Sequence, residues 1–171
     1  APPEQTRKIF AKYLKPHHIP SSKMQACYAL MLAFSKPWDR NWIAAKVRNN
    51  PIKWISVNST KPQRDKDVTC FVAHSKSNWA DSNINTDLDD VKNVLFKEFS
   101  EITGINPFQA DYQSVHRWRY ALVANTEKLG PYLDKEFNLA STGDWCHTSR
   151  IEEVYLNAKE LVREITNQLG Y

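Results

Sequence analysis

The chain of 171 residues is long enough for one domain with a hydrophobic core and too short to expect two. Its composition, 42% hydrophobic, 25% charged and 12% aromatic, is that of a globular protein and excludes a disordered chain. No apolar run reaches the roughly 18 residues that span a bilayer, and the polar N-terminus lacks an apolar signal core. We therefore expect a soluble, cytoplasmic protein.

The net charge of +4 is unevenly distributed along the chain. Residues 1–64 contain 12 Lys and Arg against 2 Asp and Glu, whereas residues 65–171 contain 11 against 17. Such asymmetry can mark a nucleic-acid footprint, but the basic residues are scattered singly and are typical of a solvated face. A binding module for nucleic acid or an acidic partner stays open as an alternative function.

The cysteines and histidines predict no metal site. Cys27, Cys70 and Cys146 are odd in number and widely spaced, which favours buried thiols in a reducing compartment over disulfides or zinc. His17 and His18 are adjacent between prolines, where neighbouring side chains point in opposite directions, so we expect a surface turn.

In chain order, the first half predicts one helix and then a series of strands. Apolar residues recur at helical spacing over residues 4–14, before Pro16. The apolar run 24–34 is typical of a central strand buried on both faces, although a helix is not excluded by periodicity. Segments rich in β-branched and aromatic residues predict three consecutive antiparallel strands, with an exposed turn at 60–67: 41–48, 52–59 and 68–75.

The second half predicts two further helices and two strands. Residues 86–104 begin with Thr-Asp, end at Gly104 and carry one apolar face, which indicates a helix. Segments 108–121 and 137–142 are expected to be strands, the first with His116, Trp118 and Tyr120 on one face and Arg117 and Arg119 on the other. The last helix, 150–169, has an apolar stripe made of Ile151, Val154, Ala158, Leu161 and Ile165. The order of elements predicts a single α+β domain over residues 1–171, with a mainly antiparallel mixed sheet and flanking helices.

The glycines exclude two common nucleotide sites. There are four, at 104, 130, 143 and 170, and the closest two are 13 residues apart. A dinucleotide-binding fingerprint or a P-loop needs glycines within a few residues of each other, so that backbone amides can reach phosphate.

The segment 142–155, TGDWCHTSRIEEVY, is the strongest candidate site. Ser149 and Glu152 have the spacing of a capping box, which predicts a helix starting at Arg150 with its electropositive N–H groups exposed. Gly143 permits a sharp turn, and the carboxylate of Asp144 can accept hydrogen bonds from hydroxyl groups such as those of a sugar or a ribityl chain. Alternatively, Asp144 only caps the loop backbone.

The segment GDWCHTSRIEEVYLNAKELVREI (143–165) resembles the C-terminal flavin-contacting motif of renalase-like FAD-dependent amine oxidoreductases. HRWRYA (116–121) is similar to the strand that precedes that motif in the family. Three further segments match the family's substrate domain in order: ACYALMLAF (26–34), WISVNSTKPQR (54–64) and FVAHSKSNWA (71–80).

The resemblance implies a substrate domain whose partner is an N-terminal FAD-binding half that is absent here, since Ala1-Pro2-Pro3 is similar to the family's crossover between domains. It implies that FAD in the complete protein contacts Gly143, Asp144, Trp145, Arg150 and Ile151, and that His116, Trp118 and Tyr120 line the cavity for a small-molecule substrate. The flavin removes hydride from that substrate, so no side chain is named as catalytic and the isolated chain is expected to be inactive and free of FAD.

One further alternative is a degenerate, non-catalytic relative. Relatives usually carry small residues at four positions that are bulkier in this chain: Thr148, Ser149, Glu153 and Asn157.

Overall fold

The computed structural model describes residues 1–13, 19, 22–124, 130–147 and 149–169. Contacts divide the chain into two compact units, unit 1 with residues 1–25 and 120–171 and unit 2 with residues 26–119. The single domain expected from the sequence stays a prediction, because compact units of this size can belong to one domain.

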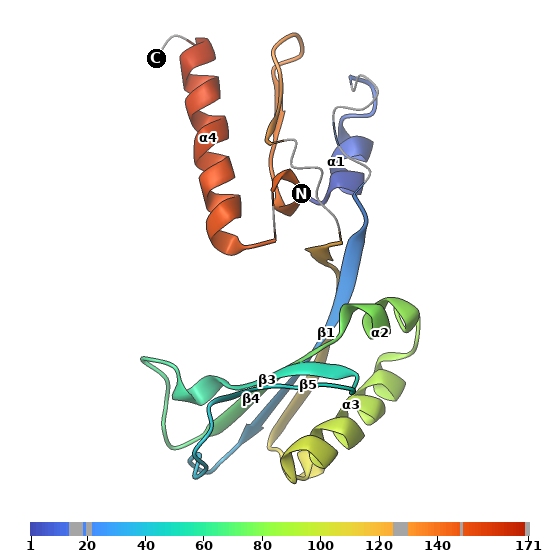
Figure 1. The fold of residues 1–171 in the computed structure, drawn as a ribbon, viewed down its shortest axis with the longest axis vertical. Coiled ribbons are helices and arrows are strands. Elements are labelled where there is room, and N and C mark those ends of the chain that lie inside the picture. The colour runs from blue at the N-terminus through green and yellow to red at the C-terminus, as the bar shows by residue number, and fades with distance from the viewer. Residues whose placement is uncertain (14–18, 20–21, 125–129, 148, 170–171) are drawn as a thin grey trace. The chain divides into compact units, whose positions relative to one another are not determined.

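Unit 2 is built on a five-stranded sheet in the order β2-β3-β4-β1-β5 (Figure 1). The strands are β1 (Met24–Phe34), β2 (Ala44–Lys46), β3 (Ile52–Val57), β4 (Thr69–Ser75) and β5 (Tyr112–Val123), of which β1 and β5 continue into unit 1. Neighbouring strands pair antiparallel from β2 through β1. The Asp111 N–H donates to the Ala33 carbonyl at 2.9 Å and the Ala124 N–H donates to the Lys23 carbonyl at 2.9 Å, so β5 is antiparallel to β1 as well.

The α+β prediction is confirmed, and the strand at 24–34 is central as expected because β4 and β5 flank it. The exposed turn expected at 60–67 is found at 61–67, and the helix expected at 86–104 is found as α3 (Leu88–Thr103). Asp87 caps α3 by accepting from the Asp89 N–H at 2.8 Å, and Gly104 ends it in the left-handed conformation, φ 67°.

Both helices of unit 2, α2 (Ser77–Ser82) and α3, lie on the same side of the sheet (Figure 1). The core lies between α3 and the sheet face that carries Tyr28, Leu30, Ile55 and Phe71. On α3 its members are Val91, Leu95, Phe96 and Phe99. The sequence did not predict α2, since six residues are too few for a helical period to emerge. Two 3₁₀ turns complete the unit, η1 (Asn58–Thr60) and η2 (Pro107–Gln109).

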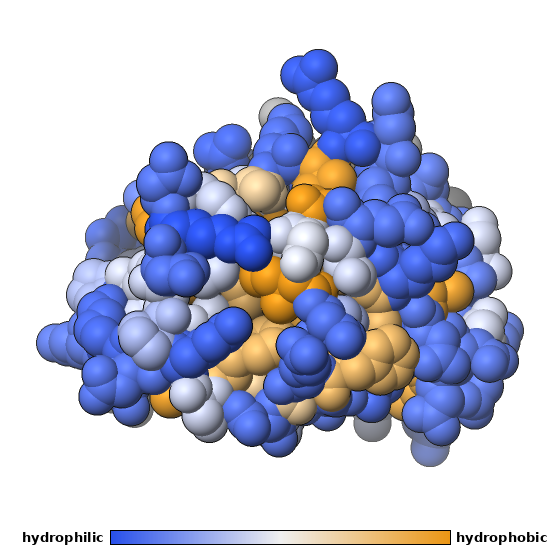
Figure 2. Space-filling view, turned by 90° about the horizontal axis from the view of Figure 1, so that it is seen from below, coloured by the Kyte–Doolittle hydropathy of each residue, from blue (hydrophilic) through white to orange (hydrophobic). Residues whose placement is uncertain are grey.

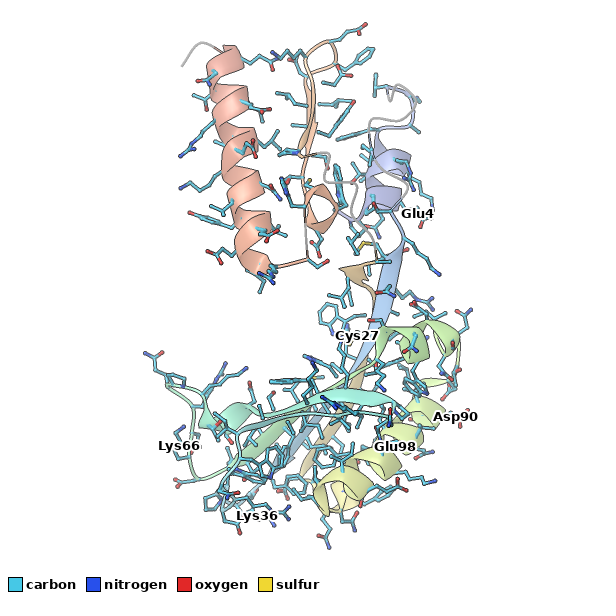
Figure 3. The ribbon with its side chains drawn as sticks, viewed as in Figure 1. Glu4, Cys27, Lys36, Lys66, Asp90 and Glu98 are labelled. Carbon is cyan, nitrogen blue, oxygen red and sulfur yellow. The ribbon has the colours of Figure 1, made fainter. Side chains whose placement is uncertain are left out.

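Polar groups tie the loops of unit 2 to the sheet and to α3. The Ala26 N–H donates to Asp81 Oδ1 at 2.8 Å, and the Ser35 N–H donates to Asp111 Oδ2 at 2.7 Å. Asp90 and Glu98 project from α3 (Figure 3), and Glu98 accepts a hydrogen bond from the Asn50 side chain. These contacts fix the ends of β1 and the loop before β3.

Unit 1 contains α1 (Pro3–Ile9), a hairpin of β6 (Tyr132–Asp134) and β7 (Leu139–Ser141), the 3₁₀ turn η3 (Asp144–Cys146) and α4 (Ile151–Leu169). Its core consists of Ile19, Tyr132, Trp145 and Cys146, with Phe10, Val123 and Leu139 packed against them. The strand expected at 137–142 is β7, whereas β6 was not predicted.

The first helix is shorter than predicted. It ends at Ile9 instead of near residue 14, and Phe10 leaves the helical conformation. Phe10 and Tyr13 pack on the β6–β7 hairpin, with ring centroids 6.1 Å from Tyr132 and 5.2 Å from Phe137. Aromatic contacts with another element therefore override the helical spacing of these residues.

The hairpin turn is fixed by Asp134 and Asn138. Asp134 Oδ1 accepts from the Glu136 N–H at 2.9 Å and from the Phe137 N–H at 3.0 Å, and Asn138 adopts φ 53°. Asp and Asn are favoured at such positions because their side chains satisfy turn amides and tolerate positive φ.

Helices that combine the length and hydropathy required to cross a membrane are absent from the described part of the chain.

Candidate functional site

Residues 142–146 form the tight turn that builds the candidate site. The Cys146 N–H donates to the Gly143 carbonyl at 3.0 Å, and the Trp145 indole Nε1 donates to the Ala1 carbonyl at 3.0 Å. Trp145 is 1% exposed. The turn is therefore anchored by a buried indole, with Asp144 directly before it.

Gly143 is required by close packing and not by its backbone conformation, since its φ of 173° is extended. A Cβ at this position would lie 2.9 Å from Trp145 Nε1 and 3.1 Å from the Ala1 carbonyl oxygen. The expected sharp turn is present, but the reason for glycine is the indole pressed against its Cα.

A cavity of about 180 Å³ opens beside this turn, within unit 1. The structure brings four predicted site residues together in its wall: Tyr120, Gly143, Asp144 and Trp145. The sequence did not indicate the other lining residues, Ala1, Pro2 and Met24. They have no polar side chain that could have identified them.

Asp144 is half-buried in this wall. Among the described residues, no hydrogen bond or ion pair engages its carboxylate. The alternative that Asp144 only caps the loop backbone finds no support in this part of the chain. A half-buried carboxylate without a donor is suited to accept hydrogen bonds from a ligand.

The prediction of a capping box by Ser149 and Glu152 at the start of α4 is wrong. Ser149 Oγ accepts from the Val123 N–H at 2.9 Å, at the end of β5. The helix begins at Ile151, one residue later than expected, and the Arg150 carbonyl accepts from the Val154 N–H at 3.0 Å. Arg150 therefore occupies the capping position, and the Ser149 hydroxyl satisfies a strand amide.

Arg150 and Ile151 are both exposed and are not part of the cavity wall. Ile151 is 91% exposed, although the sequence placed it in the apolar stripe of the last helix. The rest of that stripe is half-buried or buried, with Leu161 7% exposed. Glu153 is half-buried and Asn157 is 4% exposed, whereas Thr148, like His17 and His18, lies outside the described residues.

The two faces of β5 differ as the alternation predicted. Arg117 donates to the Thr86 carbonyl, and its guanidinium lies 5.6 Å from the centroid of the Tyr28 ring, on the helix side of the sheet. His116 and Trp118 are exposed and contact each other, with ring centroids 4.3 Å apart. These two residues belong to unit 2, whereas Tyr120 belongs to unit 1.

The thiol of Cys146 is a packing group. Burial raises the pKa of this thiol above its ordinary value, and the contact with Thr142 Oγ1 at 3.5 Å only partly offsets that effect. Cys27 is buried as expected, whereas Cys70 is half-buried. In the described ranges, His, Cys, Asp and Glu side chains form no group of three that could hold a metal ion.

No family model matches this sequence. The fold is similar to that in the crystal structure of a "putative protoporphyrinogen oxidase" from Exiguobacterium sp. 255-15, with a TM-score of 0.57 and 10% sequence identity. The alignment covers 99% of this chain and 33% of that protein. This chain shares the fold of one part of that protein and spans about a third of its length.

A second, wider depression lies in unit 2 between α3 and η2. Its volume is about 470 Å³, and its wall includes Phe96 and Phe108, whose rings are 5.0 Å apart. Figure 2 shows hydrophobic residues gathered in the centre of an otherwise hydrophilic face. None of the predicted site residues lines this depression, so the cavity beside Asp144 is the better candidate for chemistry.

Proposed function

We propose that this chain is the substrate-binding part of an FAD-dependent oxidoreductase, in which segment 143–165 supplies the last contacts to the flavin cofactor. The observation that carries the proposal is the half-buried, unpaired carboxylate of Asp144 in the wall of the unit 1 cavity, within the part of the chain that the structure describes. The fold shared with one third of a protein described as a putative protoporphyrinogen oxidase supports an oxidase as the class.

The cavity fits a portion of FAD and not the whole molecule. Sites that enclose a complete small ligand usually measure about 300–1,000 Å³, whereas this cavity measures about 180 Å³. Asp144 provides an acceptor for ribityl hydroxyls, and the edge of Trp145 forms an apolar wall beside it. The glycine spacing excludes a phosphate cradle in this chain, so the remainder of the cofactor requires a separate nucleotide-binding half.

The roles of the other predicted residues follow from this division. Backbone groups at Arg150 and Ile151 would approach the flavin ring, while His116, Trp118 and Tyr120 would line the substrate cavity. A bound flavin supplies the hydride-accepting chemistry. The side chains of this chain position the donor, an amine, a reduced nicotinamide or a related compound, and exclude water from it.

An exposed apolar stripe on α4 supports a partner for unit 1. Ile151, Tyr155 and Val162 recur at helical spacing on one side of α4 and are 91%, 61% and 61% exposed. Lys159 covers only part of this stripe, with Nζ 5.6 Å from the centroid of the Tyr155 ring. Apolar side chains gathered in this way mark interaction surfaces, and the nucleotide-binding half is the partner that we propose.

The encoding reading frame and one variant test the proposal. The frame upstream of Ala1 should encode a strand followed by Gly-x-Gly-x-x-Gly, and a start codon directly before Ala1 would refute a covalently joined nucleotide-binding half. In the complete gene product, Asp144→Asn should weaken FAD binding about tenfold, the effect of losing one hydrogen bond to a charged group.

Glu160→Gln is the matched control, because it removes the same charge from an exposed position of α4. FAD dissociation constants, measured by flavin fluorescence, should be unchanged by this variant. Equal weakening by both variants would show that Asp144 acts only through net charge and would contradict its proposed contact.

A further inference from the structure

The sheet face of unit 2 opposite α2 and α3 carries a row of aligned side chains. Lys46 of β2 is the register partner of Trp54 on β3, Trp54 is the partner of His74 on β4, and His74 is the partner of Ala29 on β1. Register partners share a face, with Cβ atoms about 5 Å apart. Ala29 is buried, with 5% exposed, so the accessible part of the row consists of Lys46, Trp54 and His74.

A β-bulge adds a second lysine to this row. Ile52 pairs with Ser75 and Trp54 pairs with His74, so Lys53 is an extra residue in β3 without a partner of its own on β4. Bulges of this kind bend the strand and redirect a side chain, and they recur beside binding sites. The bulge leaves Lys53 between Ile52, which faces the core, and Trp54, which lies on the same face as His74.

Lys53 and a third lysine, Lys61, both act on His74 electrostatically. Burial, and then the ammonium groups of Lys53 and Lys61, hold the pKa of His74 below its ordinary value. We call Lys46, Lys53, Lys61, Trp54 and His74 the cationic face. Across the described residues, no carboxylate forms an ion pair with any of its three lysines.

Trp54 provides a flat apolar surface among these cations. Its side chain is 39% exposed, and helices α2 and α3 both lie on the opposite side of the sheet (Figure 1). The neighbouring positions on the same face, Ser56 and Val72, are half-buried register partners with small side chains. An exposed indole flanked by unpaired lysines is suited to a planar ring that bears an acid group.

We propose that the cationic face binds the acid group, a carboxylate or phosphate, of a substrate with a planar ring. This inference rests on the proposed function, because it assigns the open sheet face to the substrate donor. It also discriminates among donors. Lys53 and Lys61 repel a protonated amine, so an acidic ring compound is favoured over a simple aromatic amine.

A nucleic-acid strand fits the face less well. Binding of single strands uses several stacking platforms along a basic groove, whereas the cationic face has one exposed tryptophan. The other exposed aromatic residues of this sheet lie on β5, where His116 and Trp118 contact each other edge to face, with ring centroids 4.3 Å apart. The basic residues therefore suit a single anionic group better than a chain of phosphates.

Three indole probes test this proposal on the 171-residue chain. Indole-3-propionate, indoxyl phosphate and tryptamine share one ring and carry a carboxylate, a phosphate or an ammonium group. Binding is followed by NMR through the indole N–H signal of Trp54. At least one acidic probe should bind about tenfold more tightly than tryptamine, a difference of about 1.4 kcal/mol.

The double variant K53Q/K61Q should weaken the acidic probe about tenfold, since each ion pair at a partly exposed site contributes up to about 1 kcal/mol. K36Q/K97Q is the matched control: it removes two exposed lysines of unit 2 that lie outside the cationic face, one of them labelled in Figure 3. This control should change the affinity less than about twofold. Well-dispersed amide spectra of both variants confirm that they fold.

Equal affinity for tryptamine and the acidic probes, or equal weakening by both double variants, would overturn the proposal. Tight binding of an oligouridine with a steep salt dependence, without binding of the indole acids, would overturn it in favour of a nucleic-acid surface. None of these measurements uses flavin, so they test the cationic face independently of FAD binding. If the complete gene product binds no FAD, the proposed function is refuted, whereas the binding of acidic indoles to the cationic face is a separate result.

Discussion

Replacing Gly143 with alanine tests whether the turn beside the cavity depends on close packing. The added Cβ would lie 2.9 Å from Trp145 Nε1 and 3.1 Å from both Trp145 Cδ1 and the Ala1 carbonyl oxygen. Real Cβ atoms essentially never approach a neighbour within 3.0 Å, so the indole or the turn must move. Trp145 is 1% exposed and cannot rotate into solvent.

The expected cost is that of an overpacked core, about 1–3 kcal/mol. For a chain of this length each kcal/mol lowers the melting temperature by about 2–4 °C, so Gly143→Ala should melt roughly 2–12 °C lower. Because φ at Gly143 is extended, backbone strain contributes nothing to this loss.

A double-mutant cycle with Trp145→Ala isolates the contact. Alanine removes the whole indole ring, including Nε1 and Cδ1, so Gly143→Ala should cost at least about 1 kcal/mol less in the Trp145→Ala background. Unfolding free energies from urea titrations, followed by circular dichroism, provide the four values of the cycle. An equal cost of Gly143→Ala in both backgrounds would refute the packing explanation.

Three further outcomes follow from the structure. Gly104→Ala should cost about 1 kcal/mol through backbone strain alone, because its φ is 67° and no atom lies within 4 Å of the added Cβ; Gly104→Asn should recover part of that loss in thermal melts. Thiol labelling of the native chain, followed by mass spectrometry, should modify half-buried Cys70 before Cys146, because the raised pKa of Cys146 keeps its thiol protonated and its burial limits access. Faster labelling of Cys146 would contradict its role in packing. The pKa of His74 is lowered in the folded state, so protonation of this side chain favours the unfolded chain, and stability should fall as the pH drops below about 6.5 and stay unaffected above that pH. His74→Gln should flatten this pH dependence, and a titration midpoint of the His74 ring above 6.5, measured by NMR, would contradict it.

The sequence predicted elements whose pattern is long enough to show a period. The helix at 86–104 has capping residues at both ends and buries Val91, Leu95 and Phe99 as its spacing required. The apolar run of β1 and the alternation of β4 likewise identified strands. Short elements, α2 and β6, were missed because six and three residues leave too little pattern.

Local motifs failed where a distant partner competed for the same group. Ser149 and Glu152 had the spacing of a capping box, but the Ser149 hydroxyl accepts from Val123, 26 residues earlier in the chain. Phe10 and Tyr13 had helical spacing, but their rings pack on the β6–β7 hairpin. No local pattern shows such contacts.

Four of the seven residues that line the candidate cavity were predicted from the sequence. Gly143 and Asp144 stood out because glycine is rare in this chain and a carboxylate follows it directly. The cationic face was not visible, since it depends on the register of three strands and on a bulge at Lys53. A single inserted residue in a strand leaves no signature in composition or spacing.

The most direct test of the proposed division of labour is the flavin content of two purified proteins, the complete gene product and the 171-residue chain. We expect about one FAD per chain in the complete product, seen as the absorbance of bound oxidised flavin, and no stoichiometric binding by the 171-residue chain after incubation with FAD. Tight binding of one FAD by the 171-residue chain alone, or a complete product that binds none, would contradict the proposal.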